Sequence, residues 1–452
     1  MNSFTTNFGH SILLTSAVLL LLQCPQHAES VSQFQPDPFF GRFSTKTKYD
    51  WVHRNTGDPT KDEWFEAGDQ CKAVHVSTVA RHGCKYPGMK QIQDVARIYN
   101  RMKKRSFNWD SKSHPQNDNK DLVKSGREEL KLLGKRTAIR LSSLFTQTTQ
   151  LEYWTSKKQR TKDSAQEFNA GFTDVHPQFS KSPVYAESEE QLRFHAYCIK
   201  YQQVQKQKAT LAEYDHFKSK QNIRQEMDRA RQAISTGLDL DDISDDEIVA
   251  LYYMCGYETA ISKSSPWCSF LKEHGVVEVL EYLDDLKVYY QLGPAYPITW
   301  KLSCPLVTEI VREMDKAIAA IDKGHSYVRG RFAFGHTETL GPLLSALGIF
   351  DDQPPLKAEN FKKEKQRKFK SSTFLPFAAN VHFVLYKCGS VFRLKLYINE
   401  KEFPFLKCKA GGCPFDTVKK MLNDKGLIQC DNGRLCDPSR KQECQRIDDN
   451  CS

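Results

Sequence analysis

The order of strand-like and helical segments constrains the fold of this chain more strongly than any other feature of its sequence. Residues 71–80 alternate in the manner of a strand, and residues 151–155 form a second short strand-like segment. From about 175 to 295 the periodicity is helical, and strand patterns return after residue 300. Strand signals on both sides of a helical stretch predict an α/β core with a mostly α-helical domain inserted between its halves.

Several local elements follow from the same patterns. Helices are expected at 89–103, at 122–145 and from about 163 to 172, with a long polar loop at 106–121. Residues 326–350 have the pattern strand, turn, helix, and residues 380–403 have the pattern of a hairpin with its turn at 388–390. Ser244 is a candidate start of a helix in the middle of the chain.

Length and composition fit this architecture. A chain of 452 residues with 39% hydrophobic residues is long enough for two packed subdomains and apolar enough to bury a core. We expect a signal peptide at 1–30 and the first part of the α/β core at 31–174. The helical insertion domain is expected at 175–298, and the second part of the core, with a cysteine-rich tail, at 299–452.

The N-terminal segment predicts export. Residues 11–24 are about as long as the apolar part of a signal peptide, and Ala28 and Ser30 are small residues at the −3 and −1 positions of a cleavage after Ser30. A short N-terminal membrane anchor is the alternative, because the usual basic start is missing. No second apolar run has the length of a membrane span. We expect a soluble protein that is secreted or resides in the lumen of the secretory pathway.

The cysteine content agrees with an oxidising compartment. The chain has 14 cysteines, and six lie in the tail, at positions 408, 413, 430, 436, 444 and 451. A zinc site is the competing interpretation, but no CxxC pair occurs, so disulfide bonds are favoured. If Cys24 leaves with the signal peptide, 13 cysteines remain (14 minus 1) and one is unpaired. Cys84 is the candidate.

Polar clusters follow three of the strand-like segments. They are Arg81-His82-Gly83-Cys84-Lys85, residues 156–160 with Arg160, and Gly335-His336-Thr337-Glu338. Open α/β sheets bind ligands where strands end, and helix N-termini favour anions. If the three ends are neighbours, they bring together two arginines, a lysine, two histidines and one carboxylate. Such a set suits a phosphoryl group, whose oxygens match the planar fork of arginine.

The chemistry of these residue types suggests their roles. A neutral imidazole at His82 can attack phosphorus and hold it as a covalent phosphohistidine. The phosphate-binding candidates, which would offset charge on the transferring oxygens, are Arg81, Lys85, Arg160 and His336. Glu338 is the only carboxylate in the set and can protonate the leaving alcohol, then draw a proton from water. The scheme requires no metal and no cofactor.

Each candidate also has a purely structural interpretation. His82 is compatible with capping a turn, and His336 with being a buried, hydrogen-bonded histidine. Arg160 is within reach of ion pairs with Glu152 or Asp163. A carboxylate such as Glu338 in the first turn of a helix is favoured by the helix dipole.

Other charged stretches are less informative. The basic run at 357–372 and the net charge of +10 are compatible with nucleic acid binding. In an exported protein, we expect instead that the run is a solvated surface loop. The net charge is also compatible with a basic cleft for an anionic ligand. Residues 239–242 are expected to begin a solvated helix rather than to bind calcium. Lys157 and Lys158 are interpreted as solvated charges rather than as contacts to further substrate phosphates. The predicted partner is a small phosphorylated anion, without nucleic acid.

The motifs resemble those of a known family. "RHGCKYP" is similar to the RHGxRxP signature of the histidine acid phosphatases, and "GHTET" to their proton-donor region, in the His-x-Glu form of the multiple inositol polyphosphate phosphatase branch. Four further stretches, between about residues 43 and 413 and in the family's order, are also similar: "FSTKTKYDW" (43–51), "SGREELKLLGKR" (125–136), "QRTKDSAQEFNAGF" (159–172) and "MCGYETAISKSSPWCSF" (254–270).

The resemblance implies a histidine-phosphatase-like α/β core with an inserted, mostly α-helical domain, and the same roles for His82, Glu338 and the phosphate-binding residues. It also implies disulfide bonds Cys71–Cys388, Cys255–Cys268 and Cys408–Cys413. Two residues depart from the family pattern. Lys85 stands where the family has arginine, which removes the bidentate fork. Cys84 places a thiol beside the nucleophile, where oxidation would inhibit.

These observations lead to one function and two alternatives. We expect a phosphomonoesterase that hydrolyses inositol polyphosphates such as inositol hexakisphosphate through a phosphohistidine, with bisphosphoglycerate as a further substrate. The first alternative is a general secreted acid phosphatase. The second is an inactive, secreted anion-binding homologue. Turnover separates the second alternative from the enzyme, and a panel of substrates separates the first.

Overall fold

The computed structural model describes residues 38–53, 71–103, 107–115, 120–145, 151–179, 183–219, 221–272, 275–404, 408, 412–430 and 432–437. All of them belong to one compact unit, Asp37–Ser452. The signal peptide expected at 1–30, the cleavage site after Ser30, and the tail cysteines Cys444 and Cys451 lie outside the described residues.

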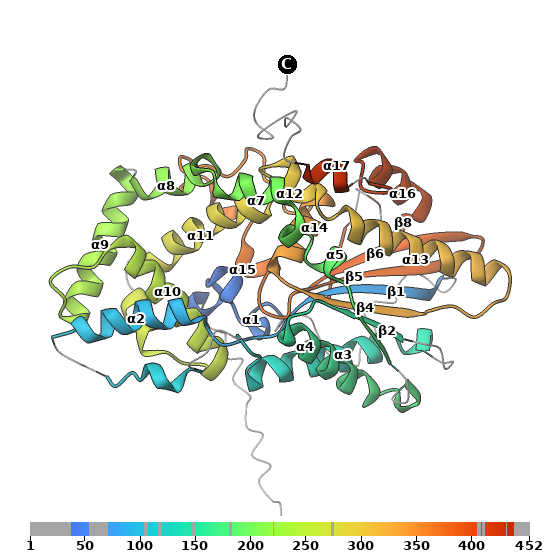
Figure 1. Cartoon of the computed structure of the whole chain (residues 1–452), viewed down its shortest axis with the longest axis horizontal. Coiled ribbons are helices and arrows are strands. Elements are labelled where there is room, and N and C mark those ends of the chain that lie inside the picture. Colours follow the sequence, from blue (N-terminus) through green and yellow to red (C-terminus); the bar gives the residue numbers. More distant parts are fainter. Residues whose placement is uncertain are drawn as a thin grey trace, which may run out of the picture. The chain divides into compact units, whose positions relative to one another are not determined.

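A mixed eight-stranded sheet is the centre of this unit (Figure 1). The strand order is β3-β2-β4-β1-β5-β6-β7, and β8 pairs with β6. The strands are β1 Cys71–Arg81, β2 Leu151–Thr155, β3 Val184–Glu187, β4 Gly330–Gly335, β5 Asn380–Cys388, β6 Val391–Ile398, β7 Lys401–Phe403 and β8 Cys413–Pro414. Strands β1 to β4 are mutually parallel, whereas β5 to β8 continue the sheet in antiparallel fashion.

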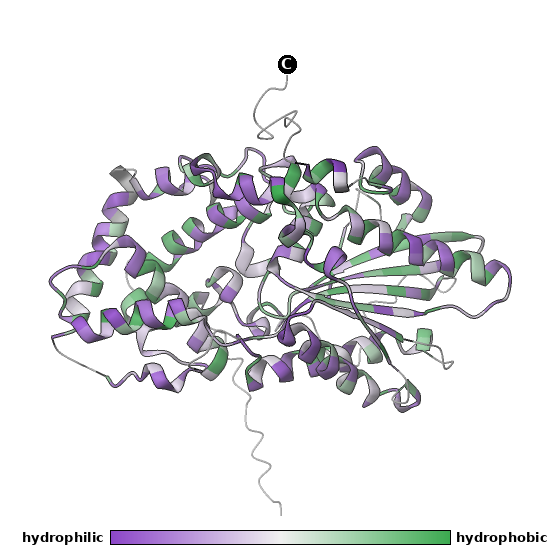
Figure 2. Ribbon diagram, in the orientation of Figure 1, coloured by the Kyte–Doolittle hydropathy of each residue, from purple (hydrophilic) through white to green (hydrophobic). Residues whose placement is uncertain are grey.

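Helices cover both faces of the sheet. In Figure 1, α3 (Lys124–Arg140) and α4 (Gln159–Thr173) lie below it, and α13 (Cys304–Asp322) and α16 (Phe415–Asp424) lie above it. Phe168 of α4 packs with Phe332 of β4 in the lower core. Met314 and Phe383 belong to the upper core. In Figure 2 many residues of the strands are green, that is, apolar, although white and purple residues lie among them.

The remaining helices lie mainly to the left of the sheet in Figure 1 or close its edges. Their bounds are α1 Tyr49–His53, α2 Met89–Arg101, α5 Glu189–Leu192, α6 Phe194–Tyr197, α7 Ile199–Lys206, α8 Ala212–Ser219, α9 Gln221–Leu238, α10 Asp245–Ser262, α11 Val276–Leu292, α12 Pro297–Lys301, α14 Thr337–Ala346, α15 Ser371–Phe374 and α17 Asn432–Cys436. Ser244 caps α10, as its sequence indicated, by accepting a hydrogen bond from the backbone N–H of Glu247.

The predicted α/β core with additional helices is therefore confirmed, whereas the boundaries at 174/175 and 298/299 stay a prediction. The helical region shares one continuous apolar core with the upper face of the sheet, since Leu251 and Phe383 belong to the same cluster. β3 is a strand within the stretch expected to be helical. Its side chains are mostly exposed, so the apolar alternation that marks a buried strand is missing from its sequence.

Three other expectations need correction. α4 begins at Gln159, four residues before the expected start, which places Arg160 in its first turn. Trp109 of the supposed polar loop is buried, and its indole N–H donates to Glu258 of α10 at 2.6 Å. The basic run at 357–372 is not wholly solvated, because Arg367 is buried and paired with Asp285 at 2.6 Å.

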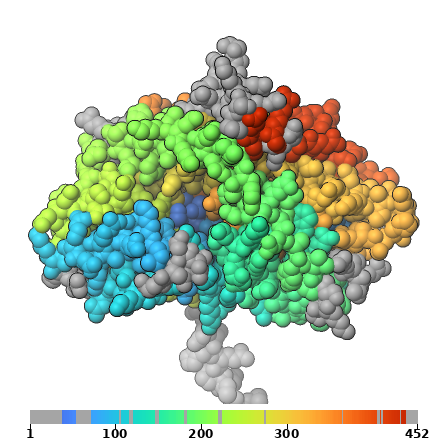
Figure 3. Space-filling view, in the orientation of Figure 1, coloured from blue at the N-terminus to red at the C-terminus, as the bar shows by residue number. Residues whose placement is uncertain are grey.

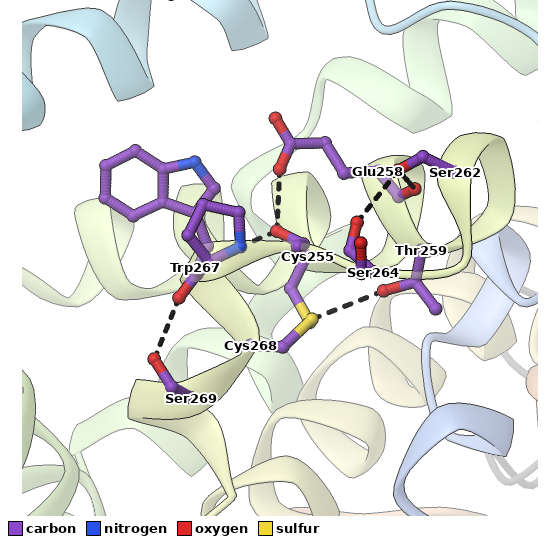
Figure 4. The surroundings of a disulfide bond; sticks show 10 residues. Cys255, Glu258, Thr259, Ser262, Ser264, Trp267, Cys268 and Ser269 are labelled. Carbon is purple, nitrogen blue, oxygen red and sulfur yellow. Dashed lines mark hydrogen bonds between the residues drawn. A yellow bond between two sulfur atoms is a disulfide. The ribbon is translucent and has the colours of Figure 1, made fainter. Parts of the chain in front are cut away.

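Five disulfide bonds cross-link the described residues. Cys71–Cys388, Cys255–Cys268 and Cys408–Cys413 confirm the three expected pairs, and Cys198–Cys436 and Cys304–Cys430 attach the C-terminal segment to α7 and α13. Figure 4 shows Cys255 and Cys268 joining α10 to the turn that carries Trp267. Cys84 is free, as expected, and it is buried. Such a framework is typical of proteins that fold in the secretory pathway.

Among the described helices, none combines the length and the apolar character needed to cross a bilayer.

Candidate active site

The sheet order explains why the three polar clusters meet. β4 lies between β1 and β2, and all three strands are parallel. Arg81 is in register with Gly335, and Thr155 with Phe334. The residues that follow these strands, His82, Ser156 and His336, therefore leave the sheet at the same edge. The predicted convergence of the three strand ends is observed.

A cavity of about 630 Å³ opens at this edge. Figure 3 shows a hollow on one face of the molecule, with the dark-blue segment around residues 44–53 visible at its bottom. All six residues singled out in the sequence line the cavity, together with nine others. The lining residues are Thr45, Lys46, Arg81, His82, Lys85, Gly88, Met89, Lys90, Gln91, Lys120, Arg160, Tyr257, His336, Thr337 and Glu338.

The hydrogen bonds of His82 define its reactive nitrogen. Nδ1 lies 2.9 Å from the carbonyl oxygen of Gly83, which can only accept, so Nδ1 carries the proton and Nε2 holds the lone pair. Burial, and then the charges of Arg81 and Arg160, lower the pKa of His82 well below its usual value. The ring is therefore neutral and nucleophilic over the physiological range.

Close packing beneath this turn fixes its position. Gly83 and Gly126 of α3 face each other so tightly that a Cβ on Gly83 would lie 2.2 Å from the carbonyl oxygen of Gly126. A Cβ on Gly126 would lie 2.1 Å from the carbonyl oxygen of Cys84. The backbone N–H of Cys84 also donates to Glu129 at 3.1 Å. Only glycine allows α3 to approach the end of β1 this closely.

Arg81 is held rigidly at the end of β1. Its Nη1 donates to the carbonyl oxygens of Thr45 at 2.5 Å and Leu375 at 2.8 Å, and its guanidinium lies over the ring of Phe377. Burial lowers its pKa to about 10, so it remains a cation at physiological pH. These contacts engage Nη1 and one face of the guanidinium, so its other N–H groups can donate to an anion in the cavity.

Lys85 and Cys84, which follow His82 in the turn, lie in different environments. The ammonium group of Lys85 donates to the hydroxyl of Tyr257 at 3.1 Å and to the carbonyl oxygen of Tyr86 at 3.2 Å. Burial, followed by repulsion from Arg160 and Arg81, lowers the pKa of Lys85 to about 7. The thiol of Cys84 is fully buried, and burial and Glu129 raise its pKa well above the usual value, so it is an unreactive thiol.

Arg160 and His336 contact each other directly. Nη2 of Arg160 donates to Nδ1 of His336 at 3.3 Å, so Nε2 of His336 carries the proton and donates to Ser156 Oγ at 2.9 Å. Burial and Arg160 lower the pKa of His336 to about 3. The ring centroids of His336 and His82 are 5.6 Å apart. Of the ion pairs considered for Arg160, Glu152 is paired with Arg331 and Asp163 with Arg127.

Glu338 lies in the first turn of α14 and lines the cavity. Burial raises the pKa of its carboxyl group, but His195 and Arg81, among other neighbours, lower the pKa by more, so the pKa lies below its usual value. It is the only carboxylate among the lining residues.

The sequence did not identify several members of the cavity wall, among them Lys46, Lys90, Lys120 and Tyr257. Lys46 lies in the stretch "FSTKTKYDW" and Tyr257 in "MCGYETAIS"; both stretches resemble the family, but the sequence indicates no role for these two residues. Lys157 and Lys158 line a neighbouring cavity of about 780 Å³ that shares Lys120 and Arg160 with the first one. Lys157 and Lys158 are exposed, in agreement with the solvated interpretation.

Comparison with known proteins shows which family the chain belongs to. The model of the histidine phosphatase superfamily (branch 2) matches residues 73–407. The chain is 29% identical to multiple inositol polyphosphate phosphatase 1 of Homo sapiens over 89% of each chain. It is also 29% identical to the Gallus gallus protein of that name, over 81% of this chain and 86% of the relative.

Solved structures agree on the fold. A complex of the Bifidobacterium longum multiple inositol polyphosphate phosphatase with inositol hexasulfate superposes with a TM-score of 0.67, at 16% identity, and the match covers 86% of this chain and 97% of that chain. The phytase from D. castellii also gives a TM-score of 0.67, at 17% identity, over 94% of this chain and 92% of the other.

Proposed function

This chain belongs to branch 2 of the histidine phosphatase superfamily and is a histidine acid phosphatase, a phosphomonoesterase, and from that premise we propose that it hydrolyses inositol polyphosphates through a phosphohistidine at His82. One observation carries the proposal. His82, which has a lone pair on Nε2, lines the same cavity as the cations Arg81, Lys85 and Arg160.

The first step transfers the phosphoryl group to the enzyme. Nε2 of His82 attacks phosphorus while the bond to the ester oxygen breaks, and the carboxyl group of Glu338 donates its proton to the leaving alkoxide. Arg81, Lys85 and Arg160 bind the transferring oxygens and stabilise their charge, while His336 holds the guanidinium of Arg160 in place through Nδ1. The substrate's negative charge raises the pKa of Glu338 relative to the free enzyme, which favours the protonated form needed here.

The second step returns the enzyme to its starting state. The carboxylate of Glu338 takes a proton from a water molecule, the water oxygen bonds to phosphorus, and the bond to Nε2 of His82 breaks. Inorganic phosphate leaves, and His82 is again neutral. The hydrogen bond from Nδ1 to the carbonyl oxygen of Gly83 keeps the ring oriented in both steps.

The charge of the cavity supports a substrate with several phosphates. Beyond Arg81, Lys85 and Arg160, two partly buried lysines line the wall: Lys46 and Lys120. This exceeds what one transferring phosphate requires. The similarity to the two relatives called multiple inositol polyphosphate phosphatase points the same way. We include bisphosphoglycerate as a smaller substrate that would use the same site.

The test of this proposal is phosphate release from inositol hexakisphosphate at mildly acidic pH. Wild-type protein should release inorganic phosphate, and His82→Ala should reduce release to background. His325→Ala, at an exposed histidine outside the cavity, serves as the matched control and should retain activity. Release by the His82→Ala variant at the wild-type rate would overturn the histidine mechanism.

Two outcomes would support the alternatives instead. Binding of inositol hexakisphosphate without release would indicate an inactive anion-binding homologue. A kcat/KM for p-nitrophenyl phosphate equal to or above that for inositol hexakisphosphate would indicate a general acid phosphatase. We also infer export with cleavage after Ser30, which N-terminal sequencing of the secreted protein checks.

A further inference from the structure

We propose that Lys46 determines substrate specificity: its ammonium group binds a phosphate of the substrate other than the one transferred to His82, and so favours substrates with several phosphates. The inference rests on the proposed function, because it concerns the same cavity. Lys46 lies in the short 3-10 helix Ser44–Lys46, more than thirty residues before the Arg-His-Gly turn, and it lines the cavity wall.

The backbone around Lys46 is tied to the phosphate-binding arginine. The carbonyl oxygen of Thr45 accepts a hydrogen bond from Nη1 of Arg81 at 2.5 Å, and that of Thr47 accepts one from the backbone N–H of Phe377. The hydroxyl of Ser44 lies 2.7 Å from that of Ser371. Lys46 is thus presented from a fixed segment, at a fixed position relative to Arg81.

The side chain of Lys46 approaches the cavity from the helical part of the molecule. Its Nζ lies 3.4 Å from Asp284 Oδ2 of α11 and 3.8 Å from the ring centroid of Tyr253 of α10. The other phosphate-binding candidates come from the sheet edge and from the helices that follow it. A phosphate that contacts Lys46 therefore lies toward α10 and α11, whereas His82 and His336 follow strands at the sheet edge.

Asp284 stabilises the charged form of this buried lysine. Burial lowers the pKa of Lys46, and the carboxylate of Asp284 opposes that effect. The pKa of Asp284 itself lies below its usual value because Lys46 and Lys287 outweigh the cost of its burial. Lys46 lines the cavity whereas Asp284 and Lys287 are not among its lining residues, so the ammonium group is the charge that a phosphate meets here. Only two acceptors are engaged by Nζ in these contacts, which leaves a donor for the substrate.

Lys90 provides a matched control within the same wall. It lines the cavity too, but its side chain is 90% exposed and is paired with Asp94, whereas that of Lys46 is 15% exposed. A charge in solvent contributes little to binding, and a charge held in a desolvated wall contributes more. The two lysines should therefore differ strongly in their effect on a polyphosphate.

Titration calorimetry on the His82→Ala protein measures binding without turnover. We compare that protein with versions that also carry Lys46→Met, Lys46→Arg or Lys90→Met, and we titrate each with inositol hexakisphosphate and with inorganic phosphate. Lys46→Met should raise the Kd of the hexakisphosphate on the order of tenfold, because a charge-assisted hydrogen bond is lost. It should change the Kd of inorganic phosphate less than about twofold. Lys46→Arg should stay close to the parent.

Three results would overturn the inference. The first is that Lys46→Met and Lys90→Met weaken binding of the hexakisphosphate equally. The second is that Lys46→Met weakens binding of inorganic phosphate as much as binding of the hexakisphosphate. The third is that folded Lys46→Arg loses as much affinity as Lys46→Met. Thermal denaturation of each variant establishes that it is folded. Failure of the proposed function is a separate result: the wild-type protein would bind the hexakisphosphate with the same dependence on Lys46 but release no phosphate from it.

Discussion

At the scale of single residues, reactivity in this cavity is set by which hydrogen-bond partners can only accept and which can only donate. The carbonyl oxygen of Gly83 fixes the proton of His82 on Nδ1, and the guanidinium of Arg160 fixes that of His336 on Nε2. Both rings are therefore neutral in defined tautomers. Their burial reinforces this by lowering both pKa values.

Lys85 makes phosphate binding sensitive to pH. A lysine whose pKa is about 7 is charged in acid and loses its charge as the pH rises through 7, whereas an arginine stays charged. For Lys85→Arg, the ratio of mutant to wild-type kcat/KM should increase up to about tenfold between pH of about 5 and about 8. Other titrating groups affect both proteins, so the ratio isolates residue 85. A ratio that does not vary with pH would contradict the role of Lys85 as a titrating contact.

The sequence identified those site residues whose motifs follow strand ends, because His82, Arg160 and His336 are positioned by the strands directly before them. It did not identify Lys46 or Tyr257. Lys46 reaches the cavity through a segment bonded to Arg81, and Tyr257 through helix α10. Their positions depend on contacts between segments far apart in the chain, which no local pattern encodes.

At the scale of elements, the contact between α3 and the end of β1 determines where the catalytic turn lies. Gly126→Ala tests this contact. The change would favour an isolated helix by about 1 kcal/mol. Here the added Cβ would lie 2.1 Å from the carbonyl oxygen of Cys84, so we expect a net loss of about 1–3 kcal/mol in the free energy of unfolding and reduced kcat.

The control for this substitution is Gly41→Ala, where a Cβ would meet nothing within 4 Å. Urea unfolding and phosphate release measure the two effects. If Gly126→Ala were as stable and as active as Gly41→Ala, the close approach of α3 would not position the turn.

Element boundaries were predicted well where apolar residues alternate and poorly where they do not. β1 and the hairpin of β5 and β6 have long buried faces, and both occur as predicted. α4 begins earlier than expected because its first turn, with Gln159 and Arg160, is polar and lines cavities rather than a core. β3 was missed because, as an exposed edge strand, it has no buried face to mark its period.

At the scale of the whole molecule, disulfide bonds connect segments that the sheet does not. Cys304–Cys430 closes a sequence separation of 126 residues, and Cys255–Cys268 one of 13. The entropy lost by the unfolded chain grows with loop size, to about 5 kcal/mol for the long loop and about 3 kcal/mol for the short one. Replacing both cysteines of a pair by serine should therefore lower the free energy of unfolding by about 2 kcal/mol more for Cys304–Cys430 than for Cys255–Cys268.

Urea unfolding of the two double variants checks this expectation, with inositol hexakisphosphate omitted so that ligand binding does not add stability. An equal loss in both variants, or a larger one for the short loop, would mean that the chain entropy of the unfolded state does not govern these bonds.

The whole-molecule architecture was predictable in class but not in arrangement. Strand signals on both sides of a helical stretch gave the α/β core, and three disulfide pairs followed from family resemblance. The order of strands in the sheet could not be obtained this way, because it depends on which buried faces meet after the chain crosses the helical region. That order, with β4 between β1 and β2, is what brings His82, Arg160 and His336 together.

We propose that His82 carries the phosphoryl group during turnover. Rapid quenching of the wild-type protein during hydrolysis of inositol hexakisphosphate, followed by peptide mass spectrometry, tests it most directly. We expect one phosphoryl group on the peptide that contains His82, stable in base, lost in acid and missing from His82→Ala. Steady turnover with no phosphorylated His82 at any quench time, or with the phosphoryl group on another residue, would contradict the account.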